Sequence, residues 1–242
     1  MNLLAIETST EFCSLAICVG AEFHATHVHA GQRHAEIVLE AVGSLMADAG
    51  LHFGALDGIA FGKGPGSFTG LRIACGVAQG LALARDIGVV GVCTLEALAE
   101  ECDADAAITC LDARMGEVYL AAYRRRSAAA APRTEIAASG WDTVLAPGLY
   151  SPRDVPALAG GGWTGCGSGF AAYGEVLATR YAANITTLVE TNAKAVMVER
   201  VPTASAVLRL ALPVFAAGGA RDAAEALPLY LRDKVALKKG EQ

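Results

Sequence analysis

A glycine-rich run, Gly62-Lys63-Gly64-Pro65-Gly66-Ser67-Phe68-Thr69-Gly70, contains the residue types that point most directly to chemistry. Glycine permits tight backbone turns, Pro65 stiffens the turn, and Ser67 is placed to cap the helix that follows. A turn at a helix N-terminus can bind an anion, but the Gly-Lys-Ser/Thr ending of a P-loop is absent. We therefore interpret Gly64, Pro65, Gly66 and Gly70 as a structural turn, with phosphate binding as the alternative.

Nucleophilic catalysis needs a serine or cysteine with an oriented base, and the sequence lacks that pattern. Ser67 directly follows Gly66 and precedes Phe68 and Thr69, so it does not sit in a Gly-x-Ser-x-Gly elbow. Asp112 and Arg114 could serve as an acid and an oxyanion clamp, but a hairpin turn with an internal salt bridge explains them equally well. We therefore expect no catalytic residue.

Metal binding is the next chemistry to consider. His24, His27 and His29 lie in one predicted strand, and His27 and His29 share a face of it. Without a carboxylate or cysteine at ligand spacing, we interpret them as surface residues and expect no metal site. The seven cysteines are an odd number without a Cys-x-x-Cys pair, so we expect reduced, mostly buried thiols rather than a disulfide framework.

Composition excludes several classes of protein. With 53% hydrophobic and 18% charged residues, the 242-residue chain is too apolar for intrinsic disorder. A net charge of −6 and a pI near 5.4 argue against a surface that binds nucleic acid unaided, because that affinity needs clustered Lys and Arg. No apolar stretch resembles a membrane span and no basic segment opens a secretory signal, so we expect a cytoplasmic protein without a membrane role.

The first hundred residues predict a lobe that opens with three antiparallel strands. Apolar runs at 3–6 and 15–19 flank a polar turn, which is typical of a hairpin, and residues 22–29 alternate like a half-exposed strand. Further along, the apolar periodicity and the turn residues predict strands at 57–62 and 89–93 and helices at 32–49, 67–85 and 94–101, the last with Thr94 as its N-cap.

The helix at 67–85 is unusual because small residues occupy more than one of its faces. Gly76 and Gly80 lie inside it, and a helical glycine costs about 0.5–1 kcal/mol relative to alanine. Packing on the chain's own sheet is one explanation. The alternative is a helix-on-helix interface with a partner, in which small residues let the helix axes approach closely.

The second part of the chain predicts a smaller lobe. Residues 106–111 and 117–123 suggest a hairpin, 170–181 a helix, and 207–215 a helical stripe; the Pro/Gly-rich segment 147–162 and the Ala-rich stretch 127–132 are less regular. We therefore expect an α/β protein of two lobes, 1–102 and 103–242, with the alternative that the final helix and tail return to the first lobe.

Four segments, 4–10, 64–73, 112–119 and 228–232, together resemble the TsaB (YeaZ) family, in the same order and across nearly the whole chain. They include Glu7-Thr8-Ser9-Thr10, Gly64-Pro65-Gly66-Ser67, Asp112-Ala113-Arg114-Met115-Gly116 and Tyr230-Leu231-Arg232. The resemblance implies an ASKHA fold (actin/Hsp70-like, RNase H-like) whose mixed sheet begins with a hairpin.

In that fold the first hairpin turn contacts nucleotide phosphates, so the resemblance makes Glu7, Thr8, Ser9 and Thr10 the candidate nucleotide-binding residues. The second glycine-rich motif of the catalytic paralogue TsaD is not evident, which implies a relic site with no cofactor of its own, and ATP with Mg²⁺ only within a complex. TsaD also has a His-x-x-x-His metal-binding pair. At the corresponding place, residues 94–98, this sequence has no histidine.

The resemblance further implies a non-catalytic scaffold that binds a TsaD-like catalytic subunit through the helices at 32–49 and 67–85. That complex, with a TsaE-like ATPase, modifies adenosine 37 of ANN-decoding tRNAs by threonylcarbamoylation. The alternatives are a stand-alone ATP-dependent enzyme or glycoprotease-like peptidase, and a homodimer when the chain is alone. The expected interface residues are Arg33, His34, Ile37, Val38, Ala41, Leu45, Ser67, Leu71, Ala74, Cys75 and Ala78.

The one dense basic run is Arg124, Arg125 and Arg126, at the end of a predicted hairpin. We interpret it as a solvated strand edge, where charge discourages unwanted strand pairing. A contact to tRNA phosphates is the alternative.

Overall fold

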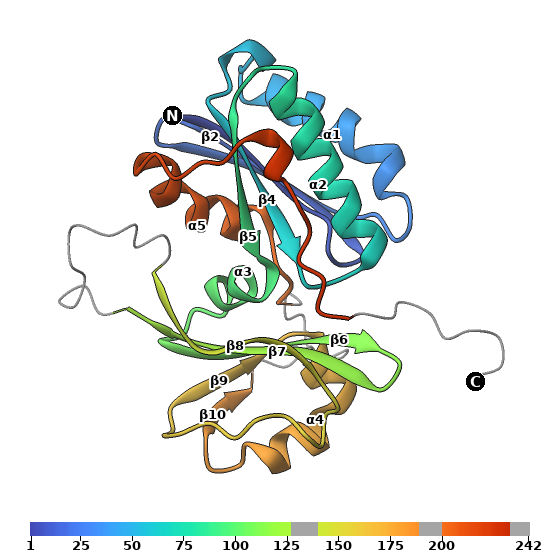
Figure 1. Cartoon of the computed structure of the whole chain (residues 1–242), viewed down its shortest axis with the longest axis vertical. Coiled ribbons are helices and arrows are strands. Elements are labelled where there is room, and N and C mark those ends of the chain that lie inside the picture. Colours follow the sequence, from blue (N-terminus) through green and yellow to red (C-terminus); the bar gives the residue numbers. More distant parts are fainter. Residues whose placement is uncertain (127–139, 189–199, 233–242) are drawn as a thin grey trace.

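The computed structural model describes residues 1–126, 140–188 and 200–232, and Figure 1 shows them as two lobes stacked along the long axis. Each lobe contains a five-stranded sheet. The Ala-rich stretch 127–132 and the tail beyond Arg232 lie outside the described residues.

The first sheet is built as the sequence predicts. Its strands are β1 (Asn2–Glu7), β2 (Phe12–Val19), β3 (Glu22–His29), β4 (Gly58–Gly64) and β5 (Gly88–Cys93), in the order β3-β2-β1-β4-β5. The first three strands pair antiparallel as consecutive hairpins, whereas β4 runs parallel to β1 and β5 parallel to β4. β1 is central and almost fully buried, so it places its C-terminal residue, Glu7, inside the lobe.

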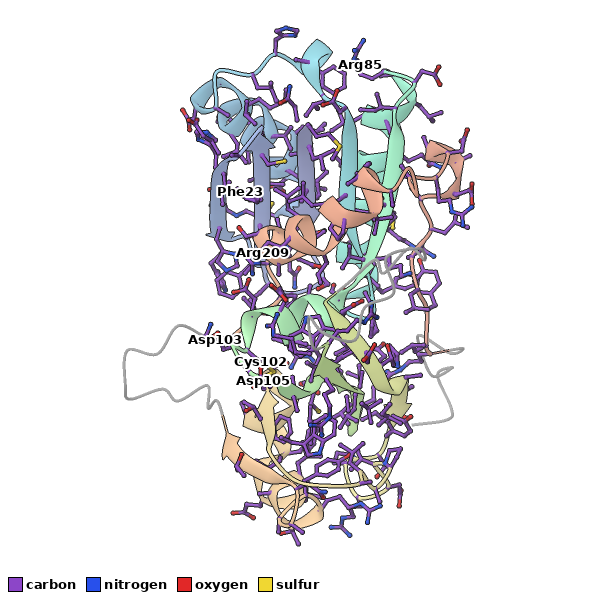
Figure 2. The ribbon with its side chains drawn as sticks, turned by 90° about the vertical axis from the view of Figure 1, so that its left-hand side faces the viewer. Phe23, Arg85, Cys102, Asp103, Asp105 and Arg209 are labelled. Carbon is purple, nitrogen blue, oxygen red and sulfur yellow. A yellow bond between two sulfur atoms is a disulfide. The ribbon has the colours of Figure 1, made fainter. Side chains whose placement is uncertain are left out.

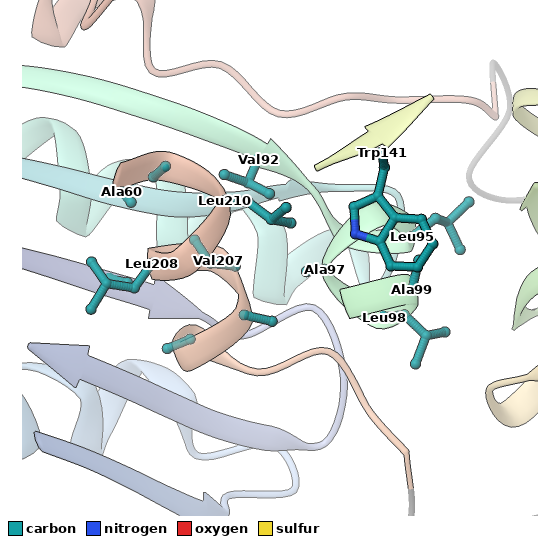
Figure 3. Packing of buried hydrophobic residues seen from close by; sticks show 14 of the residues in the cluster. Ala60, Val92, Leu95, Ala97, Leu98, Ala99, Trp141, Val207, Leu208 and Leu210 are labelled. Carbon is teal, nitrogen blue, oxygen red and sulfur yellow. The ribbon is translucent and has the colours of Figure 1, made fainter. Parts of the chain in front are cut away.

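Helices cover both faces of this sheet. Helices α1 (His34–Asp48) and α2 (Phe68–Leu83) pack on one face, with the short η1 (Phe53–Ala55) between α1 and β4. Helix α5 (Ala204–Ala216) covers the opposite face (Figure 1). Figure 3 shows Val207, Leu208 and Leu210 of α5 beside Ala60 and Val92 of the first sheet.

The C-terminal segment therefore belongs to the first lobe, which corrects the simple division at residue 103. Ala204 N at the start of α5 donates to Ser14 Oγ (2.9 Å) on β2. Beyond α5, Arg221 pairs with Val89 on β5, and η2 (Ala223–Glu225) packs on α2. The second lobe is in effect an insertion into the first.

The second sheet has the order β10-β9-β6-β7-β8. The expected hairpin is present as β6 (Ala106–Arg114) and β7 (Glu117–Arg125), and the expected helix as α4 (Ser168–Arg180). Three further strands were not predicted: β8 (Trp141–Tyr150), β9 (Trp163–Cys166) and β10 (Ile185–Leu188). β8 begins before the segment 147–162 that was predicted to be irregular, and it continues into that segment. The strand contains Pro147. β8 is an edge strand, where a proline is tolerated because it removes no needed hydrogen bond.

Helix α3 (Thr94–Glu101) joins the lobes, and one apolar core runs through the junction. Leu95, Leu98 and Ala99 of α3 lie beside Trp141 of the second lobe (Figure 3). Thr94 does not cap α3 as expected: its hydroxyl instead accepts a hydrogen bond from Gly64 N (3.1 Å), because the helix begins against the end of β4.

The expectation that all seven cysteines are reduced is wrong for two of them. Cys102, at the end of α3, is disulfide-bonded to Cys166, at the end of β9, and Figure 2 places Cys102 at the junction of the lobes. The other five, Cys13, Cys18, Cys75, Cys93 and Cys110, are free thiols, and all but Cys93 are buried. Among the described residues, no helix is both long enough and apolar enough to cross a bilayer.

Candidate functional site

The turn between β1 and β2 makes hydrogen bonds to other groups of the same chain. Glu7 Oε1 accepts from Ser9 N (2.6 Å), and the Thr8 hydroxyl donates to Gly70 O (2.8 Å). Thr10, which is only half-buried, accepts from Phe12 N (3.3 Å). Three hydrogen bonds within the protein thus use polar groups that a phosphate-binding turn would direct toward its ligand.

The glycine-rich run packs directly on this turn. Ser67 N donates to Ser9 O (2.8 Å), and the Ser67 side chain caps α2 by accepting from Gly70 N (3.4 Å), as the sequence predicts. A Cβ on Gly66 would lie 2.6 Å from Ser9 Cβ, and one on Gly70 would overlap Thr8 O. These glycines are required because the two backbones touch, which supports the structural interpretation of the turn.

Glu7 is a buried carboxyl group with a raised pKa. Its side chain is 1% exposed, and burial raises its pKa to about 7, although hydrogen bonds from Ser9 offset part of that rise. Oε2 has no hydrogen-bond partner and lies where a Cβ of Gly62 would be. A carboxyl group enclosed in this way cannot reach a magnesium ion in solvent without rearrangement of the turn.

A cavity of about 590 Å³ lies between the lobes. Ser9, Thr10 and Ser67 line it from the first lobe, and Arg114 and Ser168 line it from the second. Of the four candidate nucleotide-binding residues, the structure therefore brings Ser9 and Thr10 to the cavity, whereas Glu7 and Thr8 are buried behind it.

Most of the expected interface residues are not on the surface, which corrects that assignment. The apolar stripe of each helix faces the helix's own sheet, because that sheet offers the nearest apolar surface. Arg33 and Ser67 are exposed, and Ile37 and Ala41 are half-buried. The buried members are His34, Val38, Leu45, Leu71, Ala74, Cys75 and Ala78.

The surface of these helices that turns away from the sheet carries other residues. Leu39 on α1 is 58% exposed and Leu83 on α2 is 61% exposed. A Cβ built on Gly43, Gly76 or Gly80 would meet no atom within 4 Å. We call these five residues the outward helical face. Sequence periodicity missed its two leucines because single apolar residues outside the main stripe carry no periodic signal.

Comparisons with known proteins agree over almost the whole chain. The model of the TsaD family, described as tRNA N6-adenosine threonylcarbamoyltransferase, matches residues 27–239. The chain is 32% identical to the tRNA threonylcarbamoyladenosine biosynthesis protein TsaB of Escherichia coli, covering 99% of this chain and 98% of that protein. It is 31% identical to TsaB of Haemophilus influenzae, covering 99% and 97%. The chain belongs to the TsaB family.

Solved structures of TsaB-like proteins share its fold. The crystal structure of a protein from Pseudomonas aeruginosa with similarity to peptidase YeaZ has a TM-score of 0.80 and 33% identity, covering 96% of this chain and 99% of that one. YeaZ from Pseudomonas aeruginosa has a TM-score of 0.75 and 32% identity, covering 95% and 99%. The α/β ASKHA architecture expected from the sequence is thereby confirmed.

The remaining candidate sites of this TsaB-family chain have structural explanations. Asp112 and Arg114 form the expected turn, with a 3.1 Å salt bridge and a 2.8 Å bond from Arg114 N to Asp112 Oδ1. His27 and His29 are exposed, as predicted, and both rings pack on Phe12. In the three described ranges, no group of three or more His, Cys, Asp or Glu side chains could hold a metal ion.

The basic run is not a strand edge, which corrects our interpretation. β7 lies between β6 and β8, and each arginine has a partner within the chain. The Arg124 guanidinium lies 4.7 Å from the centre of the Trp163 ring, Arg125 pairs with Glu100 (3.4 Å), and Arg126 pairs with Asp142 (2.9 Å). Each arginine of the run is thus held by a contact within the chain.

Proposed function

We propose that this chain is a non-catalytic subunit in the biosynthesis of threonylcarbamoyladenosine in tRNA. It binds a TsaD-like catalytic subunit through the outward helical face, in the cytoplasm. The names of its E. coli and H. influenzae relatives support the pathway. Its own turn at Glu7–Thr10 supports a non-catalytic role, because Glu7 and Thr8 are buried behind the cavity and each makes a hydrogen bond within the chain.

The proposed interface rests on one observation: Gly76 and Gly80 on α2 face open space. Each glycine weakens an exposed helix by about 1 kcal/mol relative to alanine, and no contact in the described protein compensates for that cost. A partner helix packed closely on α2 compensates for it, because small residues bring helix axes together. Leu39 and Leu83 supply the apolar area that such a contact buries.

Other members of the complex follow from the same proposal. A TsaE-like ATPase and tRNA contact the assembled complex rather than this chain alone, in keeping with a net charge of −6. ATP and Mg²⁺ belong to the complex and are not a resident cofactor of this subunit. Without the catalytic subunit, the outward helical face pairs with a second copy of the chain.

The test is size-exclusion chromatography with light scattering of this protein mixed with the TsaD paralogue of the same organism. We expect a stoichiometric complex with the wild-type chain and none with Gly76→Leu or Gly80→Leu, because a leucine side chain separates the helices. The control is Gly174→Leu, since Gly174 also faces open space but lies just after the kink at Tyr173 in α4 of the second lobe, away from the proposed interface.

The same measurements distinguish the outcomes. Circular dichroism and thermal unfolding check that each variant is folded. Unchanged complex formation by both interface variants would refute the interface, and the absence of a complex with the wild-type chain would refute the scaffold role. Chromatography of the chain alone reports whether it forms a homodimer.

A further inference from the structure

The segment that follows η2 connects the two lobes across the cavity. It runs beside the end of β4 and reaches the second lobe near β6 (Figure 1). Leu229, Tyr230, Leu231 and Arg232 all line the cavity. The segment has no regular secondary structure, so its position depends on the contacts at its two ends.

The first end is attached to the first lobe. Leu229 N donates to Lys63 O (2.6 Å), and Arg72 Nε on α2 donates to the Tyr230 hydroxyl (2.9 Å). The Arg72 guanidinium also lies 3.8 Å from the centre of the Phe68 ring. A Cβ on Gly64 would lie 2.9 Å from Leu229 O, so the chain passes Gly64 at close range.

The second end is attached to the turn between β6 and β7. Arg232 Nη2 donates to Ala113 O (2.9 Å) and to Glu117 Oε2 (2.7 Å). Its side chain is only 13% exposed. Burying a guanidinium is costly unless its charge is paired, and the Glu117 carboxylate and the Ala113 carbonyl offset that cost, although Nε has no hydrogen-bond partner.

The turn to which Arg232 is hydrogen-bonded contains two residues with unfavourable backbone conformations. Arg114 and Met115 both have left-handed backbone conformations, with φ of 62° and 57°, which non-glycine residues seldom adopt. Such residues persist when surrounding contacts hold them. By bonding the carbonyl of Ala113 just before these residues, Arg232 stabilises the turn in the position that forms one wall of the cavity.

We propose that residues 228–232 form a latch between the lobes, and that the state of this latch sets the width of the cavity. The lobes are already joined on the other side by α3 and the Cys102–Cys166 disulfide. The latch joins the lobes on the opposite side of the cavity from this junction. A ligand or partner that displaces Arg232 from the turn opens the cavity.

A latch differs from two independent local contacts in one measurable way. Breaking the contacts at one end must increase amide hydrogen exchange at the other end. We would measure amide hydrogen exchange by mass spectrometry on the full-length protein, for the wild type, Arg232→Ala and Tyr230→Ala. We expect Arg232→Ala to speed exchange of the Leu229 amide, and Tyr230→Ala to speed exchange across residues 113–117 of the other lobe. Arg232→Ala should give an increase of about tenfold, the low end of the effect of losing a hydrogen bond to a charged group, and Tyr230→Ala a smaller increase, because the Tyr230–Arg72 bond is exposed.

Arg126→Ala is the matched control, because its 2.9 Å pair with Asp142 lies entirely within the second lobe. It should change neither segment. If the effect of each latch variant stays within the lobe that carries the broken contact, the proposal is wrong. Should Arg232→Ala fail to fold, Glu117→Gln removes only the charge of the partner carboxylate and must produce the same cross-lobe effect.

Discussion

Gly62, Gly66 and Gly70 lie in crowded surroundings, whereas Gly76 and Gly80, a few residues further along the same segment, face open space. The crowded glycines are explained within the chain, because a side chain at any of them would overlap Glu7, Thr8 or Ser9. The open ones are not explained by any contact in the described protein. The comparison separates glycines that the fold needs from glycines that it does not need, and we propose that a second molecule contacts Gly76 and Gly80.

The largest effect is expected at the crowded end. Gly70→Ala places a methyl group on Thr8 O, between two backbones that cannot move independently. We expect it to lower the free energy of unfolding by about 3 kcal/mol or more, at the upper end of overpacking costs. Urea denaturation measures the change. A loss below about 1 kcal/mol would mean that the turn can yield and that the crowding is not essential.

Glu7, which lies against Gly62 in the crowded region, makes the stability of the protein depend on pH. Because burial raises its pKa from 4.5 to about 7, the folded protein binds the proton more tightly than the unfolded chain. The protein should therefore be most stable below pH 4.5 with respect to this group and lose on the order of 3 kcal/mol as the pH rises to 7. Urea denaturation between pH 5 and 8 measures the slope.

Glu7→Gln is the control for that prediction, because it keeps the acceptor for Ser9 N and removes the titration. Its stability should be independent of pH over the same window, apart from contributions of other groups. The buried Cys75 thiol near Glu7 has its own pKa raised to about 12 and does not titrate there. An identical slope in Glu7→Gln would assign the pH dependence to other residues.

A smaller effect is expected at Thr8. Its hydroxyl bonds Gly70 O in a buried position, so Thr8→Val leaves that carbonyl without this donor. We expect a loss of about 1 kcal/mol in the free energy of unfolding. Thr10→Val serves as the comparison, since Thr10 is only half-buried, and should change stability by less than about 0.5 kcal/mol.

A small effect of opposite sign is expected at the open end. Gly76→Ala should stabilise the isolated chain by about 0.5–1 kcal/mol, because the methyl group meets no atom and alanine favours the helix. Thermal unfolding measures the gain. Destabilisation instead would show that another part of this chain packs on Gly76, and the distinction between the two groups of glycines would fail.

The first lobe could be predicted from the sequence because its signals are local. The polar turn between two apolar runs defined the opening hairpin, and Gly50 and the cap at Ser67 marked helix boundaries. In the second lobe, β9 and β10 have only four residues each, too few for a periodic signal. β8 was missed because Pro147 and Gly148 are strand breakers except at an edge, and the sequence does not say which strand is at the edge.

The candidate site was predicted less well, for two physical reasons. Val38, Leu71 and Ala74 were assigned to a partner because an apolar stripe does not reveal which surface buries it. The Cys102–Cys166 pair was missed because proximity across 64 residues is a property of the fold, and counting cysteines cannot identify it. The sequence pointed to the turn at Glu7–Thr10, but only the structure shows that Glu7 and Thr8 are buried behind the cavity and bonded within the chain.

The return of α5 to the first sheet has a consequence for the order in which the protein can form during synthesis. The bond between Ser14 and Ala204 spans 190 residues, so one face of the first sheet stays uncovered until the ribosome has released α5. The strand pairings of the second sheet all lie within residues 106–188, and closure of shorter loops costs less entropy. The lobe translated second can therefore finish folding first, and the lobe translated first finishes last.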